Sequence, residues 1–293
     1  MKNIKILLVS MMILIAMASC NKLKEPYIIE SIVSQSDTIA LEAADTTNFD
    51  GKVVVLLEDY TGVKCVNCPG ATEIAANLQT QYGEHLVVLG VHPNNPGNMS
   101  QQSPSGGFPD FRTDDGKTWN DYYNIAAYPS GTVNRTGSVL GAPQWTTAVN
   151  EIMGNDAPVR LIVKTLFDDA TRELKISVHS KFLQNVESND VRLTICMMED
   201  NIIGKQVVPT SVNPAGYAED YVHRHVFRGT VDGQVWGNVL DENAETIAAG
   251  RNFITNMKFK VSTDYNADEF YIVAFISDNN TKEVLMTAET KIK

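Results

Sequence analysis

The sequence has few cysteines and histidines, the residues that hold most zinc ions in proteins. It holds four cysteines and five histidines in 293 residues. A structural zinc site needs four ligands, and beside Cys65 and Cys68 the sequence offers one further candidate, His92. No second cysteine or histidine pair lies at a matching spacing. The sequence therefore argues against a zinc module, and we expect neither a metal nor an organic cofactor.

Positive charge is also scarce. Lysine and arginine total 24 against 35 aspartate and glutamate residues, for a formal net charge of −11. Removal of Lys2 and Lys5 with an N-terminal signal would take this charge to −13. An acidic chain without a lysine and arginine cluster is a poor ligand for nucleic acid, so we exclude nucleic acids as partners.

Past the N-terminus, no apolar run is long enough to cross a membrane. At the N-terminus, Lys2 and Lys5 precede the apolar stretch Ile6–Ala16, and small residues lead to Cys20. Residues 1–19 are therefore interpreted as a signal peptide. The segment resembles a bacterial lipoprotein signal, which implies a lipid on Cys20 and membrane contact through acyl chains. The alternative is an ordinary cleaved signal in which Cys20 has no special role.

The pair Cys65–Cys68 follows the apolar run Val53–Leu57 and precedes the helix-patterned stretch Ala71–Tyr82. A sulfur at a helix N-terminus faces unpaired N–H groups and the positive end of the helix dipole, which favour the thiolate. This order indicates a thiol–disulfide site, with half of a zinc site or a structural disulfide as alternatives. Outside the cytosol the disulfide is the expected resting state. Cys196 is interpreted as a small buried hydrophobe.

The expected fold class is α/β plus all-β. A tether with short strands at Tyr27–Val33 and Thr38–Leu41 is expected in residues 20–51, and alternating strands and helices in 52–154. Residues 155–293 show short β-branched or alternating segments separated by turn residues, which predicts a β-sandwich of immunoglobulin-like size. Within the first part we expect strands at 53–59, 86–92 and 132–134, with helices at 71–82, 118–124 and 144–153. Within the second part we expect strands at 159–167, 173–182, 191–199, 221–228, 253–261, 270–277 and 284–290.

From about Lys52 to Met153 the chain resembles the thioredoxin superfamily. The CxxC after a strand, Asp59 six residues before Cys65, and the Tyr128-Pro129-Ser130 string carry this resemblance. It implies that Cys65 is the nucleophile, Cys68 the resolving thiol and Asp59 the group that moves the proton. It also implies a cis bond before Pro129, with Tyr128, Pro129 and Ser130 binding an extended protein or peptide substrate. From the residues alone, Asp59 is equally an acid at an exposed strand end.

Nearly the whole chain resembles the twenty-eight-kilodalton outer-membrane-protein family of Bacteroidota. The strings 58–62, 65–69, 127–135 and 221–226 carry this resemblance together with the N-terminal signal. It implies an outer-membrane lipoprotein with a thioredoxin-like domain followed by a β-sandwich. Two functions stay open: thiol–disulfide exchange, in which Cys65 attacks a substrate disulfide and Cys68 resolves the intermediate, and surface binding or adhesion with a structural disulfide. Lys64 replaces the aromatic residue that thioredoxins carry before the first cysteine.

Two further features remain. The proline- and glycine-rich loop between His92 and Lys117 is interpreted either as a surface insertion held by its aromatic residues or as a roof over the cysteines. His223 and His225 alternate on a predicted strand and so share one face. Packing between domains is favoured there over a metal site, which has no obvious third ligand unless His179 joins.

Overall fold

A computed structural model describes residues 38–98, 100 and 105–293 of the chain. The predicted signal peptide, Cys20 and the predicted strand Tyr27–Val33 lie outside the described residues. The α-helices are α2 (Ala43–Thr47), α3 (Cys68–Tyr82), α4 (Asp114–Tyr122) and α5 (Ala142–Ile152), and the 3-10 turns are η2 (Gly83–His85) and η4 (Ala267–Glu269). The strands are β1 (Val55–Tyr60), β2 (Leu86–Val91), β3 (Ser130–Val133), β4 (Val159–Phe167), β5 (Glu173–Phe182), β6 (Val191–Glu199), β7 (Ile202–Val207), β8 (Tyr217–His223), β9 (Val226–Thr230), β10 (Asn238–Val239), β11 (Asn252–Lys260), β12 (Phe270–Asp278) and β13 (Val284–Lys291).

An eight-stranded sheet joins the two halves of the sequence. Its strand order is β13-β12-β6-β9-β2-β1-β3, with β10 paired to β6. Strands β1 and β2 are parallel, whereas β1 and β3 are antiparallel. The halves meet where Gly90 of β2 pairs with Val226 of β9. The predicted boundary at residue 154 falls between α5 and β4, but strands from both sides of it share this one sheet.

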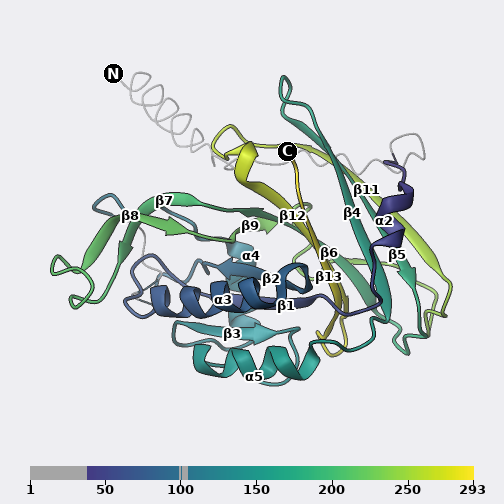
Figure 1. The fold of residues 1–293 in the computed structure, drawn as a ribbon, viewed down its shortest axis with the longest axis horizontal. Coiled ribbons are helices and arrows are strands. Elements are labelled where there is room, and N and C mark those ends of the chain that lie inside the picture. The colour runs from purple at the N-terminus through teal and green to yellow at the C-terminus, as the bar shows by residue number, and fades with distance from the viewer. Residues whose placement is uncertain (1–37, 99, 101–104) are drawn as a thin grey trace, which may run out of the picture.

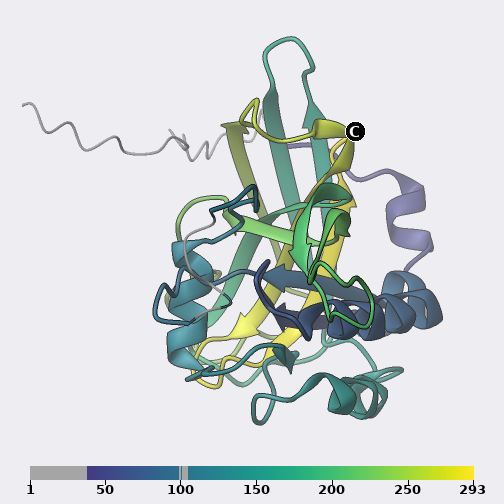
Figure 2. The ribbon, with the colours of Figure 1, turned by 90° about the vertical axis from the view of Figure 1, so that its left-hand side faces the viewer.

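Two smaller sheets complete a mixed α/β fold in which strands predominate. One has the order β11-β5-β4 and the other pairs β7 with β8. In Figure 1 the three-stranded sheet lies toward the right and the β7–β8 hairpin toward the left, beyond α3. The same three-stranded sheet projects toward the top of Figure 2.

Strand β1 is buried on both faces of the large sheet. Val55 and Leu57 pack in one apolar cluster with residues of α3, α5 and the three-stranded sheet. Leu56, pointing the other way, packs in a second cluster with Trp119 of α4. Burial on both faces explains why the sequence shows a continuous apolar run here rather than alternation.

A buried ion pair lies between β1 and the residues after β3. The Arg135 guanidinium donates to both carboxylate oxygens of Glu58, at 2.6–3.1 Å, and both side chains are almost fully buried. Thr132 Oγ1 donates to the same carboxylate at 2.6 Å. The guanidinium carbon also lies 4.4 Å from the ring centroid of Trp119 and 4.7 Å from that of Phe275. The pair therefore ties β1 and β3 to α4 and to β12 of the second half.

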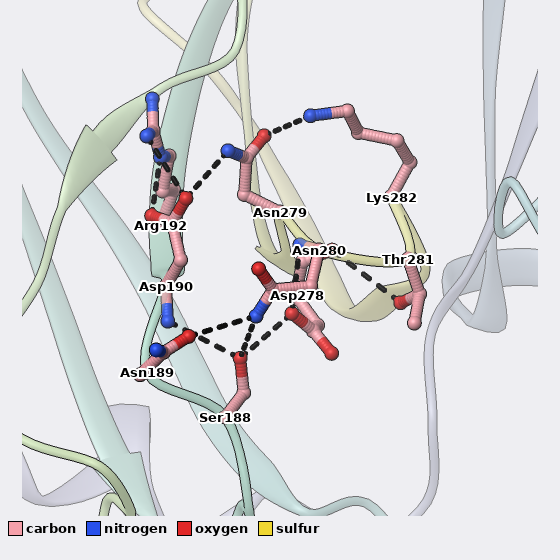
Figure 3. Close-up of polar contacts among 9 residues, drawn as sticks. All are labelled: Ser188, Asn189, Asp190, Arg192, Asp278, Asn279, Asn280, Thr281 and Lys282. Atoms are coloured by element: carbon pink, nitrogen blue, oxygen red, sulfur yellow. Dashed lines mark hydrogen bonds and ion pairs between the residues drawn. The ribbon is translucent and has the colours of Figure 1, made fainter.

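A polar network at one end of the sheet connects the loop before β6 to the turn between β12 and β13 (Figure 3). Ser188 Oγ donates to Asp278 at 2.7 Å, and Asn279 Nδ2 donates to Asp190 at 2.7 Å. Asp190 also pairs with Arg192. Because these contacts satisfy the side chains mutually, we assign the network a structural role.

Two expected strands differ in the structure. Residues Thr38–Leu41 form no strand, because Ile39 bonds to side chains of β5, its N–H to Ser177 Oγ and its carbonyl to His179. The helix α2 follows instead. The expected single strand Tyr221–Arg228 divides into β8 and β9 because His225 has a left-handed backbone, with φ of 54°.

Replacing one member of the buried pair tests its importance. Arg135→Met leaves the Glu58 carboxylate buried without its partner, and we expect a loss of about 3–5 kcal/mol in the free energy of unfolding. The double variant Glu58→Met/Arg135→Met should recover much of this loss. Arg251→Met, which breaks an exposed pair with Asp241, is the control and should cost less than about 1 kcal/mol. Urea unfolding of the wild type, Glu58→Met, Arg135→Met, the double variant and Arg251→Met measures these values, and a double effect equal to the sum of the two single effects would contradict the coupling.

Candidate functional site

Cys65 and Cys68 form a disulfide in the turn between β1 and α3, with an S–S distance of 2.06 Å and Cα atoms 5.4 Å apart. Cys68 is the first residue of α3, and Pro69 lies in its first turn, where a missing N–H is tolerated. The predicted order of strand, turn, cysteine pair and helix is therefore confirmed, with the helix beginning three residues earlier than expected.

The disulfide is covered by the β7–β8 hairpin of the second half. Only 3% of Cys65 and 2% of Cys68 is exposed. Gln206 of β7 donates from its side-chain nitrogen to the carbonyls of Cys65, at 3.1 Å, and Gly62, at 3.3 Å. The next N–H, of Val207, donates to Val63 at 2.9 Å. Strand β7 was not predicted, so this cover was missed.

The second part of the proline-rich loop, residues 105–113, packs beside the same turn. Phe111 is buried against Val63 and Val226. The Phe108 ring lies 5.8 Å from Lys64 Nζ and 5.2 Å from Lys205 Nζ. Aromatic side chains therefore hold this part of the loop against the CxxC turn and β7.

Asp59 lies behind the disulfide rather than at an exposed strand end. Its side chain is almost fully buried, and Oδ1 has no hydrogen-bond partner among the described residues. Asp59 and Cys68 both line a small cavity of about 20 Å³. Burial raises the pKa of Asp59 to about 8, so the carboxyl group is mostly protonated at neutral pH.

The Tyr128–Pro129 peptide bond is cis, which confirms the predicted conformation. Ser130 pairs with Tyr60 at the end of β1 from which the chain leads to Cys65. Tyr128 is held by a hydrogen bond from its hydroxyl to Asn120 Oδ1 at 2.7 Å. Substrate binding by Tyr128, Pro129 and Ser130 stays a prediction.

Three histidines line the cavity that Asp59 and Cys68 share: His92, His223 and His225. All are at least nine-tenths buried. Burial lowers the pKa of His92 to about 3 and that of His223 to about 4, and it also lowers the pKa of His225. His179 lies elsewhere, on strand β5 of the three-stranded sheet, where its ring nitrogen bonds to the Ile39 carbonyl. Within the described residues, no group of three or more histidine, cysteine, aspartate or glutamate side chains has the geometry to hold a metal ion.

A wider groove of about 650 Å³ opens on the outer side of the CxxC turn. Val66 and Asn67, between the two cysteines, form part of one wall, and Val212 and Val222 part of the other. The residues that line it come from the start of α3 and from the β7–β8 hairpin with its connecting loop. Both halves of the sequence therefore surround the disulfide.

Comparison with protein families gives one match. The family model "Outer membrane protein Omp28" matches residues 116–293, more than half of the chain. The chain belongs to the Omp28 family. This membership places it in the outer membrane, as the sequence predicted. The matched residues begin in α4, so the Cys65–Cys68 disulfide lies outside them, whereas Gln206, His223 and His225 lie within.

Solved structures give more distant likenesses. HBP35 of Porphyromonas gingivalis is 19% identical with a TM-score of 0.59, over 82% of this chain and 76% of that one. A domain of the outer membrane lipoprotein Omp28 from Porphyromonas gingivalis is 20% identical over 47% of this chain and 89% of that one, with a TM-score of 0.30. The first likeness supports a shared fold. No curated protein matches the sequence. Among the described residues, no helix has the length and apolar character needed to cross a membrane.

The buried carboxyl of Asp59 predicts a pH dependence of stability. Because its pKa is raised above that of an unfolded chain, the folded protein binds more protons between about pH 4 and pH 8. Its contribution therefore lowers stability as the pH rises, by up to about 1.4 kcal/mol per pH unit. Asp59→Asn should remove this slope and stabilise the protein at pH 8 more than at pH 4. Chemical unfolding at both pH values measures it, with the exposed Asp264→Asn as control; equal stabilisation at both would refute the raised pKa.

The hydrogen bonds of Gln206 predict that the hairpin limits access to the disulfide. Gln206→Met removes its side-chain bonds to the carbonyls of Gly62 and Cys65, each worth about 0.5–1.5 kcal/mol. We expect dithiothreitol to reduce the disulfide about tenfold faster in this variant, as local opening becomes easier. Alkylation of freed thiols followed by mass spectrometry gives the rate. Gln184→Met, at an exposed position, should leave the rate unchanged, and an unchanged rate in Gln206→Met would show that the hairpin does not limit access.

Proposed function

We propose that this outer-membrane protein is a lipid-anchored thiol–disulfide exchange protein whose residues 52–154 form a thioredoxin-like domain. The observation that carries the proposal is the buried carboxyl of Asp59 beside Cys68. An uncompensated polar atom in a protein core costs about 1–3 kcal/mol, so packing alone does not explain it. A protonated acid next to a leaving sulfur has a direct use in exchange chemistry.

The exchange reaction needs only residues of this chain and a partner that carries thiols. A substrate thiolate attacks Cys65 Sγ, the Cys65–Cys68 bond breaks, and Cys68 leaves as a thiolate. Asp59 gives its proton to that thiolate. A second substrate thiolate then attacks the substrate sulfur of the mixed disulfide, which releases Cys65 and leaves the substrate oxidised by two electrons. In the reverse direction the Cys65 thiolate attacks a substrate disulfide and Cys68 resolves it.

Lipid attachment through Cys20 completes this proposal. The supporting features are the signal-like N-terminus and the name of the related Omp28 domain, that of an outer membrane lipoprotein. Residues 155–293 are proposed to form a sandwich-like part. It differs from a separate β-sandwich domain because one of its sheets continues into the strands of the first half. A protein or peptide substrate is expected, because the hairpin must shift before any thiol reaches Cys65.

The burial of the disulfide favours a second candidate function. With both cysteines 2–3% exposed and Gln206 bonded across the turn, the pair is also suited to stiffen the β1–α3 junction. In that case the protein is a non-enzymatic surface binding or adhesion lipoprotein. The two functions predict different reduction potentials for the same pair.

The reduction potential of the Cys65–Cys68 pair distinguishes the two functions. Exchange predicts a value between about −120 and −270 mV, measured by equilibration with glutathione and thiol alkylation, together with catalysed reduction of insulin disulfides. Cys65→Ala should abolish that catalysis, whereas Cys196→Ala, which removes the unrelated thiol, should retain it. A potential below about −300 mV with no catalysis would refute exchange and support the structural disulfide.

A further inference from the structure

The cavity behind Cys68 combines an acid and one imidazole from the first half with two imidazoles from the second half. Its lining includes Asp59, Cys68, His92, His223 and His225. At about 20 Å³ it has room for a single water molecule. A water in such a space needs two to four polar partners, and this lining supplies them.

His225 stands out among these residues because neither ring nitrogen has a hydrogen-bond partner among the described residues. Asp59 Oδ1, from another residue of the same lining, likewise has no hydrogen-bond partner among the described residues. Both side chains are more than nine-tenths buried. Buried polar groups normally have a hydrogen-bond partner. Because these two groups have none among the described residues and line one cavity, a water molecule in that cavity would join them.

The backbone around His225 is held so that its ring reaches this cavity. Gly90 pairs with Asp59 on one side, and its N–H donates to the His225 carbonyl at 2.7 Å on the other. A Cβ atom at Gly90 would lie 3.2–3.3 Å from the carbonyl oxygens of Arg224 and His225, so a glycine allows this close approach. The His225 N–H donates to Asp200 at 3.0 Å, which fixes the corner from outside.

Burial around the cavity keeps the imidazoles neutral and the acid protonated. His92, directly after β2, and His223 of β8 are neutral at neutral pH, because burial lowers the pKa of each. Burial, the largest effect, lowers the pKa of His225, while Asp200 raises it and Arg224 lowers it. Tyr221 of β8 and Arg224 complete the titratable groups that line the space, since Cys68 does not titrate while it is in the disulfide. A neutral imidazole has one donor and one acceptor nitrogen, as a proton relay needs.

We infer that His225 relays protons between the Asp59 carboxyl and solvent across this cavity while the Cys65–Cys68 pair exchanges. The inference rests on the proposed exchange function and adds a positioning residue from the second half of the chain. When Cys68 leaves as a thiolate it takes the Asp59 proton, which leaves a buried carboxylate. His225 restores that proton from solvent through the cavity, and in the reverse direction it removes one. No electrons pass through His225; they move only between the sulfurs.

His225→Asn tests the relay, because asparagine tolerates the left-handed backbone at this position but cannot carry a proton as imidazole does. We expect the rate of disulfide reduction by a dithiol peptide to fall about tenfold, as general acid–base steps often contribute more than this. The loss should be greatest above pH 8, where Asp59 must be reprotonated. His179→Gln, at a histidine away from the cavity, should keep both the rate and its pH profile.

A readout independent of activity separates the relay from the exchange function. The ring nitrogens of His225 should shift in a ¹⁵N spectrum when Asp59 is replaced by asparagine, because the relay requires the two groups to interact across the cavity. Unchanged shifts, or an unchanged pH–rate profile in His225→Asn, would overturn the relay while leaving exchange intact. A wild-type protein without exchange activity would instead overturn the proposed function and, with it, the relay. A change in the ¹⁵N shifts of His225 would in that case show only that His225 and Asp59 interact.

Discussion

The positions of the other groups in the site depend on one buried ion pair. Arg135 and Glu58 are both enclosed, and their fork-shaped contact is surrounded by the rings of Trp119 and Phe275. Each ion is expensive to bury alone, so β1, β3, α4 and β12 must all be in place for either to be tolerated. Asp59 is the next residue along β1 and so points to the opposite face of the sheet. The pair that fixes Glu58 on one face thereby fixes the acid behind the disulfide on the other.

The two halves of the chain share one site rather than standing apart. The first half supplies the cysteines, Asp59 and His92, and the second supplies Gln206 over the disulfide and His223 and His225 behind it. Contact between the halves runs through β2 and β9 at a glycine, where the backbones approach closely. A family match that begins in α4 covers the enclosing half and not the cysteines. The residues that match the family model therefore contribute to the site by enclosing the CxxC turn.

Local patterns predicted the elements well because periodicity and turn residues act within a few positions. The apolar run at Val53–Leu57 and the helix that starts at the cysteines are local features, as are most strands of the second half. Strand β7 was missed because Gly204, Lys205 and Gln206 lack an apolar alternation, and its burial comes from contact with the CxxC turn. The break at His225 has no decisive local signal, since histidine takes a left-handed backbone more often than most residues but still uncommonly. Glu58 reads as an exposed acid until its partner 77 residues later is known.

The enclosure of Cys196 has a consequence for how the chain becomes oxidised. Its side chain is fully buried in β6 between β9 and β12, and burial raises the pKa of its thiol. Both neighbouring strands come later in the sequence, so this protection arises only after most of the chain has been synthesised. Before then the thiol is free to form a wrong bridge. Cys65 and Cys68 are three positions apart, and the small entropy loss on closing so short a loop favours their pairing over any bridge to Cys196. The spacing of the CxxC thus directs oxidation to the native bridge at the stage when a third thiol is still accessible.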